Sequence, residues 1–588
     1  MTRQEIKKRA ELYIEREKNE SFKEEIGKLL ESANWNELEE RFWRDLEFGT
    51  GGLRGLIGGG SNRINLVSIS RATLGLANYI ISHVPESERS VVIAYDCRRH
   101  SDEFALEAAG VMAAKGIRAF LFNSLRPTPV LSFAVRAKNA CAGIMITASH
   151  NPAAYNGYKV FWSDGAQVVP PHDEGVMDEV RRVSGPVETM DLEEALNTGF
   201  VTMIDGEIDG AYTELVVSQS LRPSLMKEHG ARLRVVYTPL HGTGLIPVKR
   251  VLGELGITAY TVREQEEPNG DFPTVDFPNP EEASALKMAI ELARKKNVDL
   301  VMATDPDADR LGIAVPEGGE WILISGNQLG AMLVDYIFRT RKELGDLPAY
   351  PAFINTIVTS TLQNRIAEFY GAASFRVLTG FKYIGEKIRQ FEAEDSYSYI
   401  FGGEESYGYL VGTSVRDKDA ISAAAMTAEM ALWNRIRGKS LIEYLRELWS
   451  RFGYWQEILI SQNFEGQRGQ ETMNALMASL RDEPPNRIAL IEVNAVRDFR
   501  DGTTLNIVDG LREKNIGLPS SNVLQFVLKG GGLVTARPSG TEPKIKFYAS
   551  LCSKNGGEPE RAKKELDGVF HGIRSWVEKR INDLEFQP

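Results

Sequence analysis

The feature that most constrains the fold is an alternation of strand and helix patterns that occurs three times along the chain. The first run begins at Val91, the second at Leu233 and the third near Ala352. In each run, short apolar stretches bounded by turn residues predict strands, and longer stretches of helical period predict helices. This alternation is typical of α/β domains with mixed, mostly parallel sheets. We therefore expect three related α/β domains, although no residue-level repeat is visible.

The segments outside these runs have different patterns. Residues 1–46 predict two amphipathic helices, and the part after about Trp449 predicts a separate α+β domain with an antiparallel sheet. We expect these domains to surround one central cleft. The expected boundaries are a helical extension over 1–48, α/β domains over 49–215, 216–325 and 326–450, and the C-terminal domain over 451–588.

Composition limits the partners and the compartment. A chain of 588 residues is too long for one core, and its net charge of -12 argues against nucleic acid or an anionic membrane as the main partner. No apolar run approaches the roughly 20 residues that cross a bilayer, and the N-terminus lacks the apolar core of a signal peptide. Cys97, Cys141 and Cys552 are scattered, which favours a reducing compartment. We expect a cytoplasmic protein.

Reactive groups gather in the segment ITASHNPAAYNGYKV, which follows the last predicted strand of the first run. Ser149, His150 and Lys159 offer a nucleophile and two proton carriers within eleven residues. Ligands of open α/β sheets bind beyond the carboxyl ends of the strands. A hydrolase with His150 as base is one alternative, but no G-x-S-x-G elbow surrounds Ser149. The candidate metal, sugar and phosphate loops described below favour a phosphoryl carrier instead.

The second run ends in DPDADR, where Asp305, Asp307 and Asp309 occupy alternate positions. Three carboxylates supply the hard oxygen ligands that Mg²⁺ prefers, and neither histidine nor cysteine is present among them to favour zinc. An EF-hand is disfavoured because its downstream glycine and glutamate are missing. An acidic turn that caps the next element is the alternative.

Three further loops carry polar side chains. Glu404 and Ser406 can present a carboxylate and a hydroxyl to neighbouring sugar hydroxyls, and Lys382 adds a cation or proton donor at the start of a helix. The glycine-rich segment GTGGLRG predicts a flexible loop that carries Arg54. Each loop alone is also compatible with a solvated turn. The RPSGTEPK loop concentrates donors suited to a phosphate dianion, namely Arg537, Ser539, Gly540, Thr541 and Lys544.

Four ordered motifs carry a resemblance to a known family. ITASHNP, DPDADR, GEESYG and RPSGTEPK, in this order and at these separations, resemble the α-D-phosphohexomutases, the phosphoglucomutase and phosphomannomutase superfamily. The resemblance covers nearly the whole chain from about Gly49. The N-terminal extension and the segments GTGGLRG, TPLHGTG and TGFKYIG are most similar to the phosphoglucomutase branch that includes phosphopentomutases and a glucose-1,6-bisphosphate synthase.

The resemblance implies a role for each motif. Ser149 would be a phosphoserine, and its phosphate would bind Mg²⁺ together with Asp305, Asp307 and Asp309. Arg54 and Arg310 would neutralise the phosphate, while His150, Lys159 and Lys382 would be the candidate acids and bases. Glu404 and Ser406 would bind the sugar, and the residues of the RPSGTEPK loop would bind the phosphate of the substrate.

We therefore expect an isomerase, an intramolecular phosphotransferase, that interconverts glucose 1-phosphate and glucose 6-phosphate through glucose 1,6-bisphosphate, as a monomer or homodimer. Phosphopentomutase, phosphomannomutase and glucose-1,6-bisphosphate synthase are the alternatives. Tyr407 and Gly408 follow Ser406 where mannose-accepting members often carry histidine, which disfavours mannose. A silent phosphosugar-binding regulator is disfavoured because the serine, the three aspartates and both lysines are present.

Overall fold

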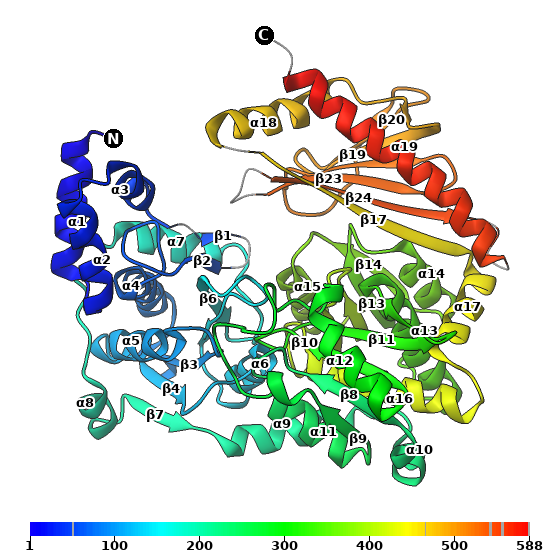
Figure 1. The fold of residues 1–588 in the computed structure, drawn as a ribbon, viewed down its shortest axis with the longest axis horizontal. Coiled ribbons are helices and arrows are strands. Elements are labelled where there is room, and N and C mark those ends of the chain that lie inside the picture. The colour runs from blue at the N-terminus through cyan, green and yellow to red at the C-terminus, as the bar shows by residue number, and fades with distance from the viewer. Residues whose placement is uncertain are drawn as a thin grey trace. The chain divides into compact units, whose positions relative to one another are not determined.

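The computed structural model describes residues 1–46, 48–49, 52–464, 466–539, 544–553, 555 and 558–585 (Figure 1). The chain divides into two compact units. The first unit contains Met1–Gly326, Pro348–Tyr350 and Gly380–Ile436. The second contains Asn327–Leu347, Pro351–Thr379 and Arg437–Pro588. The three α/β regions and the antiparallel C-terminal sheet confirm the expected fold class. No described helix is long and apolar enough to cross a membrane.

The N-terminal segment forms three helices, so the prediction of two is wrong. They are α1 (Arg3–Arg16), α2 (Glu20–Glu31) and α3 (Trp35–Phe42), the dark-blue coils of Figure 1. Ala33 adopts a left-handed conformation with φ of 50°, and the Asn34 side chain then accepts the N–H of Glu37 as a helix cap. This turn ends α2 and starts α3, a break that the apolar periodicity does not reveal.

The first α/β region of the first unit is built on a seven-stranded sheet. Strands β3, β4, β5 and β7 are parallel, whereas at one side of the sheet β6 is antiparallel to β5, β2 to β6 and β1 to β2. In sheet order the strands are β1 (Phe48–Gly49), β2 (Gly52–Leu56), β6 (Tyr155–Trp162), β5 (Ala142–Ile146), β3 (Ser90–Tyr95), β4 (Arg118–Phe122) and β7 (Val201–Ile204). Its helices are α4 (Leu66–His83), α5 (Ser101–Ala114), α6 (Thr128–Ala137), α7 (His172–Arg182), α8 (Leu192–Asn197) and α9 (Gly206–Ser218).

Part of the glycine-rich segment expected as a flexible loop is strand β2. Arg54 pairs with Gly157 across the β2–β6 ladder. Gly52 has φ of 100°, and a Cβ there would lie 2.5 Å from the carbonyl oxygen of Tyr158, so glycine permits this close approach. Residues 50 and 51 lie outside the described part of the chain. The strand forms because β6 supplies a partner edge, not because its sequence favours a strand.

The second α/β region also belongs to the first unit. Strands β10, β8 and β9 are parallel, and the chain then turns back into the antiparallel pair β11 and β12. In sheet order they are β12 (Glu320–Ile324), β11 (Leu311–Glu317), β10 (Leu300–Thr304), β8 (Arg234–Thr238) and β9 (Thr258–Thr261). The helices are α10 (Pro223–His229), α11 (Leu245–Glu254) and α12 (Ala283–Lys296). Aliphatic residues of β8, β10 and α12 form the core of this region.

The third α/β region contributes to both units. The first unit contains α15 (Phe381–Glu394), the antiparallel strands β15 (Ser398–Gly403) and β16 (Tyr409–Val411), and α16 (Ala420–Ile436). The second unit contains most of α13 (Gly326–Leu344), the parallel strands β13 (Pro351–Thr356) and β14 (Ala373–Val377), α14 (Thr361–Phe369) and α17 (Leu441–Phe452).

The C-terminal part of the second unit is an antiparallel sheet with helices α18 (Gly466–Asp482) and α19 (Pro559–Glu585) packed against it (Figure 1). A short strand, β18 (Arg487–Ile488), pairs with β19. In sheet order the others are β17 (Tyr454–Asn463), β24 (Lys544–Ser553), β23 (Leu533–Pro538), β22 (Leu524–Leu528), β19 (Ile491–Asp498), β20 (Thr503–Asn506) and β21 (Arg512–Lys514). The antiparallel α+β prediction is confirmed.

Candidate active site

Ser149 lies in a tight turn just beyond the carboxyl end of β5. Its φ of 51° is in the left-handed region, and its backbone N–H donates to Thr147 Oγ1 at 2.8 Å. The Thr147 hydroxyl in turn donates to Asp96 Oδ2 at 2.6 Å. Ser149 is 3% exposed, and its Oγ donates to Asp305 Oδ2 at 2.7 Å. The turn therefore aims the serine hydroxyl at the aspartate loop of the second α/β region.

Arg98 holds this turn in shape, and the sequence analysis missed it. Its side chain is fully buried beside Asp96, with Nε 3.4 Å from Asp96 Oδ2, and its guanidinium lies 5.0 Å from the centre of the Phe272 ring. One guanidinium thereby fixes the backbone on both sides of the serine. It donates to four carbonyl oxygens of the loop, those of Ser149, Asn151, Pro152 and Tyr155.

Replacing Arg98 by methionine is expected to lower the free energy of unfolding by about 3 to 5 kcal/mol, because Asp96 loses its buried cation. Turnover should fall by about a hundredfold as the serine moves. Urea unfolding and steady-state kinetics measure the two effects.

Arg99→Met is the matched control, since the Arg99 side chain is 58% exposed and pairs only with the exposed Asp271 among its described contacts. Its unfolding free energy should change by no more than about 0.5 kcal/mol. Equal effects of the two substitutions would contradict the role of Arg98.

The three aspartates predicted as metal ligands converge after β10. One carboxylate oxygen from each of Asp305, Asp307 and Asp309 lies within 4.8 Å of the other two, and all three residues are buried. Asp305 Oδ1 accepts the backbone N–H groups of Asp309 at 3.0 Å and Arg310 at 3.1 Å, so the loop wraps around it. Asp307 Oδ1 and Asp309 Oδ1 are buried and accept no hydrogen bond from the described residues. Such a set of oxygens fits a hard divalent cation such as Mg²⁺.

The charges around these carboxylates support the same assignment. Burial, together with the charges of Asp309 and Asp307, raises the pKa of Asp305 well above its usual range. Lys159 Nζ lies 2.8 Å from Asp307 Oδ2 and 3.5 Å from Asp309 Oδ2. Although burial opposes the shift, Lys159 and a hydrogen bond from Thr128 lower the pKa of Asp307. A bound cation would favour the ionised form of Asp305 and so oppose the rise of its pKa.

His150 and two arginines flank the serine. His150 Nδ1 lies 3.4 Å from Ser149 Oγ, and burial, with the charges of Arg310 and Arg54, lowers the pKa of His150 well below its usual range. Its imidazole is therefore neutral at pH 7 and available to accept a proton. Arg54 Nη1 donates to Asn151 Oδ1 at 3.0 Å, and Arg310 Nη1 lies 2.7 Å from Glu281 Oε1.

The turn between β15 and β16 brings the predicted sugar loop beside the aspartate loop. Glu404 Oε1 accepts the N–H of Gly380 at 2.9 Å, and burial raises the pKa of Glu404 to about 7 although the Lys418 ammonium opposes the shift. Gly408 forms a β-bridge with Arg310. Ser406 is half-buried at the tip of the same turn. Residues from three α/β regions thus meet within the first unit.

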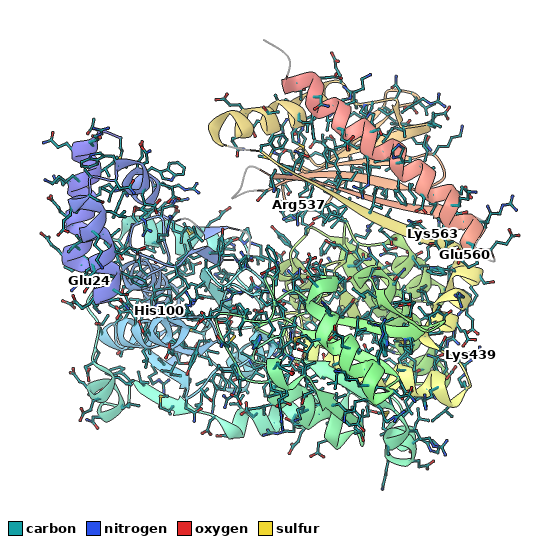
Figure 2. All side chains as sticks on the ribbon, in the orientation of Figure 1. Glu24, His100, Lys439, Arg537, Glu560 and Lys563 are labelled. Carbon is teal, nitrogen blue, oxygen red and sulfur yellow. The ribbon has the colours of Figure 1, made fainter. Side chains whose placement is uncertain are left out.

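Two predicted site residues have other surroundings. Lys382, in the first turn of α15, donates to Asp173 Oδ2 at 3.1 Å, and no described contact joins it to Ser149 or to the aspartates. Arg537 lies at the end of β23 on the C-terminal sheet (Figure 2), and Ser539 N–H donates to the carbonyl oxygen of Lys544 at 2.7 Å. Gly540 and Thr541 lie outside the described residues.

Sequence analysis also missed Thr128 and Lys418, which both contact the aspartates. Thr128 Oγ1 donates to Asp307 Oδ2 at 2.7 Å, and Lys418 Nζ lies 3.1 Å from Asp309 Oδ2. A threonine at the first position of a helix gives no signal of this role. Lys418 lies in the charged run RDKD directly before the apolar helix α16. Charged residues next to an apolar helix could have indicated buried ion pairs.

A buried serine hydroxyl lies beside three convergent aspartates and a carboxylate loop, on successive α/β regions, an arrangement that suits phosphoryl transfer. Models of the α/β/α domains I, II and III of the phosphoglucomutase/phosphomannomutase family match residues 45–185, 211–318 and 325–452. The chain belongs to this family, which confirms the resemblance drawn from the four motifs, and it is an isomerase of the phosphosugar mutase class.

Known proteins are similar to this chain in sequence, length and fold. The chain is 37% identical over 547 residues to a phosphoglucomutase of Staphylococcus aureus, covering 93% of this chain and 96% of the relative. A phosphoglucomutase of Staphylococcus haemolyticus is 37% identical over 545 residues, covering 90% and 94%. Parafusin, a phosphoglucomutase from Paramecium, has a similar fold, with a TM-score of 0.66, 17% identity and coverage of 91% and 96%. A phosphoglucomutase/phosphomannomutase family protein from Burkholderia thailandensis gives a TM-score of 0.64 at 18% identity, with coverage of 90% and 97%.

Proposed function

We propose that the chain interconverts glucose 1-phosphate and glucose 6-phosphate through a phosphorylated Ser149 and glucose 1,6-bisphosphate. The observation that carries this proposal is the 2.7 Å hydrogen bond from Ser149 Oγ to Asp305 Oδ2, within a cluster of three buried carboxylates. Phosphoryl transfer needs a positioned oxygen, which this hydrogen bond supports, and neutralisation of charge, which a cation held by the carboxylates would supply. The preference for glucose is supported by the relatives named phosphoglucomutase.

Asp305, Asp307 and Asp309 are proposed to hold Mg²⁺, which would balance the charge of roughly −1.5 to −2 on a phosphoserine. The P–O bond to Ser149 breaks as a sugar hydroxyl oxygen bonds to phosphorus. The hydroxyl proton passes to a base of the chain, and Ser149 Oγ takes up a proton as it leaves. In the second step Ser149 Oγ gives up that proton and bonds to the other phosphoryl group of the bisphosphate, and the sugar oxygen that is released takes up a proton. Reorientation of the bisphosphate between the two steps exchanges the positions of its phosphates.

The remaining polar groups are proposed to bind substrate or move protons. His150 is proposed to carry a proton near Ser149 because its Nδ1 lies 3.4 Å from Ser149 Oγ, whereas Lys159 is held protonated by two aspartates. Lys382 is proposed as a further proton carrier, and Arg54 and Arg310 as phosphate ligands. Glu404 and Ser406 would bind sugar hydroxyls. The proposed ligands of the substrate phosphate are Arg537, Ser539, Gly540, Thr541 and Lys544.

A cytoplasmic location is part of the proposal. It is supported by the cysteines, since Cys97, Cys141 and Cys552 form no disulfide among the described residues. Magnesium and a trace of glucose 1,6-bisphosphate are the cofactors that the proposed cycle requires.

The substrate is tested by comparing turnover of glucose 1-phosphate, mannose 1-phosphate and ribose 1-phosphate, each with Mg²⁺ and a trace of the matching sugar bisphosphate. We expect the highest kcat/KM with glucose 1-phosphate. A clear preference for ribose 1-phosphate would replace the proposed substrate by a pentose phosphate. Net formation of glucose 1,6-bisphosphate from glucose 1-phosphate and a phosphoryl donor, without isomerisation, would instead indicate glucose-1,6-bisphosphate synthase.

A further inference from the structure

An open pocket of about 500 Å³ lies in the second unit, against helices α13 and α17. No residue of the candidate active site is among those that line it, and Ser149 and the three aspartates belong to the first unit. The function proposed above therefore leaves this pocket unused. Its lining side chains are polar or charged, namely Arg339 and Glu343 of α13 and Glu447, Ser450 and Arg451 of α17.

A buried carboxylate holds the two arginines of the pocket in place. Asp335 is fully buried, and its Oδ1 accepts hydrogen bonds from Arg451 Nη1 at 3.0 Å and from Tyr370 Oη at 2.8 Å. Its Oδ2 accepts hydrogen bonds from Arg339 Nη2 and Tyr444 Oη, both at 2.6 Å. Two guanidinium groups thus share one carboxylate, so the arginines carry one positive charge more than Asp335 offsets.

The guanidinium group of Arg451 is fixed and still reachable from solvent. Its central carbon lies 5.0 Å from the ring centre of Phe369 and 4.8 Å from that of Phe452, distances typical of cation–π contacts. The Arg451 side chain nevertheless remains 34% exposed, against 19% for Arg339. A guanidinium group presents a rigid fork of N–H donors that matches a phosphate. The arginines therefore offer a place for one anionic group.

The other lining side chains of the pocket accept hydrogen bonds. Glu343 and Glu447 present carboxylates, and Ser450 presents a hydroxyl. Carboxylates disfavour a bare anion, although an ion pair with Lys439 offsets the charge of Glu447. They suit the hydroxyl groups of a sugar, which donate hydrogen bonds to them. The pocket thus combines donors for one anionic group with acceptors for several hydroxyls, and its volume lies within the roughly 300 to 1,000 Å³ of small-molecule sites.

We propose that this pocket is a second phosphosugar site, separate from the candidate active site. Arg339 and Arg451 bind the phosphate, whereas Glu343, Glu447 and Ser450 bind hydroxyl groups of the sugar. Free phosphate binds less well, because it brings no sugar hydroxyls to the carboxylates. The proposal goes beyond the mutase cycle and does not depend on it, since none of these side chains takes part in that cycle.

The test counts the glucose 6-phosphate molecules that the full chain binds in equilibrium dialysis, with a chelator present to suppress turnover. The unmodified chain should bind two, one at the candidate active site and one in this pocket. Arg451→Met should bind one fewer, because it loses a charged phosphate ligand. If the candidate active site binds no glucose 6-phosphate, every count falls by one while the difference between the two chains remains. Failure of the proposed function is therefore distinguishable from failure of this proposal.

The matched control is Arg341→Met. Arg341 also belongs to α13, but it pairs with Asp346 and is not among the residues that line the pocket. This variant should bind as many molecules as the unmodified chain. A loss of one molecule in both arginine variants would overturn the proposal, because the effect would then not depend on the pocket.

A second variant and a second probe test the sugar part of the proposal. Glu343→Ala, at an exposed residue, should weaken binding in the pocket about three- to tenfold, because a hydrogen bond to a sugar hydroxyl is lost. Inorganic phosphate should bind there at least about tenfold more weakly than glucose 6-phosphate. If Arg451→Met does not fold, Glu343→Ala decides. An unchanged count in folded Arg451→Met, unchanged affinity in Glu343→Ala, or equal affinity for inorganic phosphate contradicts the proposal.

Discussion

Replacing Ser149 by alanine is expected to lower turnover at least about a thousandfold while leaving the fold intact. The substitution removes the oxygen proposed to carry the phosphoryl group. Its structural cost is small, because it removes the hydrogen bond to Asp305, worth about 0.5 to 1.5 kcal/mol, and a long contact of 3.4 Å with His150. The left-handed backbone at this position is equally strained for serine and alanine.

Intact mass after incubation with glucose 1,6-bisphosphate separates chemistry from folding. The unmodified chain should gain the mass of one phosphoryl group, and Ser149→Ala should gain none. Ser163→Ala, at the exposed turn that follows β6, serves as the matched control and should behave like the unmodified chain. An unmodified chain that never gains a phosphoryl group would favour a silent phosphosugar-binding regulator instead.

Replacing Asp305 by asparagine is expected to weaken Mg²⁺ binding and to lower turnover by more than about a hundredfold, since one charged ligand is lost. The same substitution should stabilise the chain in the presence of a chelator. The pKa of Asp305 is raised in the folded state by burial and by Asp309 and Asp307. Without metal, the folded state therefore binds a proton that the unfolded state has released, and stability falls as pH rises above the unfolded pKa.

Thermal unfolding with and without Mg²⁺, at several pH values, measures both effects. The amide of the Asp305→Asn variant mimics the neutral carboxyl, so the chelated variant should melt higher than the chelated unmodified chain at pH 7 and depend less on pH. Mg²⁺ should raise its midpoint less. Asp276→Asn, at an exposed aspartate, should change neither property. A variant that still gains full stability from Mg²⁺ would remove Asp305 from the metal site.

The sequence predicted those residues of the candidate site that directly follow a strand. Ser149 follows β5 and Asp305 follows β10, and both loops leave the carboxyl ends of parallel strands, where ligands of such sheets bind. Arg98 was not predicted because it donates hydrogen bonds to backbone carbonyl groups, which every sequence contains. Lys418 escaped because its partner Asp309 lies in another α/β region. Contacts of this kind depend on how regions pack, which local patterns do not encode.

Errors in the secondary structure have the same origin. Strand β2 contains two glycines and an arginine, and it forms because the edge of β6 offers backbone partners. The break between α2 and α3 depends on one left-handed residue and one cap, whereas apolar periodicity continues across it. Lys382 was correctly placed at the start of a helix, yet its partner is Asp173 of α7 and not a residue of the serine loop.

The assembly of the site from distant segments has a consequence for synthesis of the protein. Ser149 and Asp305 are 156 positions apart, an interval that a ribosome takes roughly 8 to 30 s to translate at about 5 to 20 residues per second. Arg98 and Asp96 are made before the serine, so the turn can form early. The aspartates and then Lys418 emerge later. A nascent chain can therefore form the serine turn many seconds before it contains the aspartates that we propose to bind the metal.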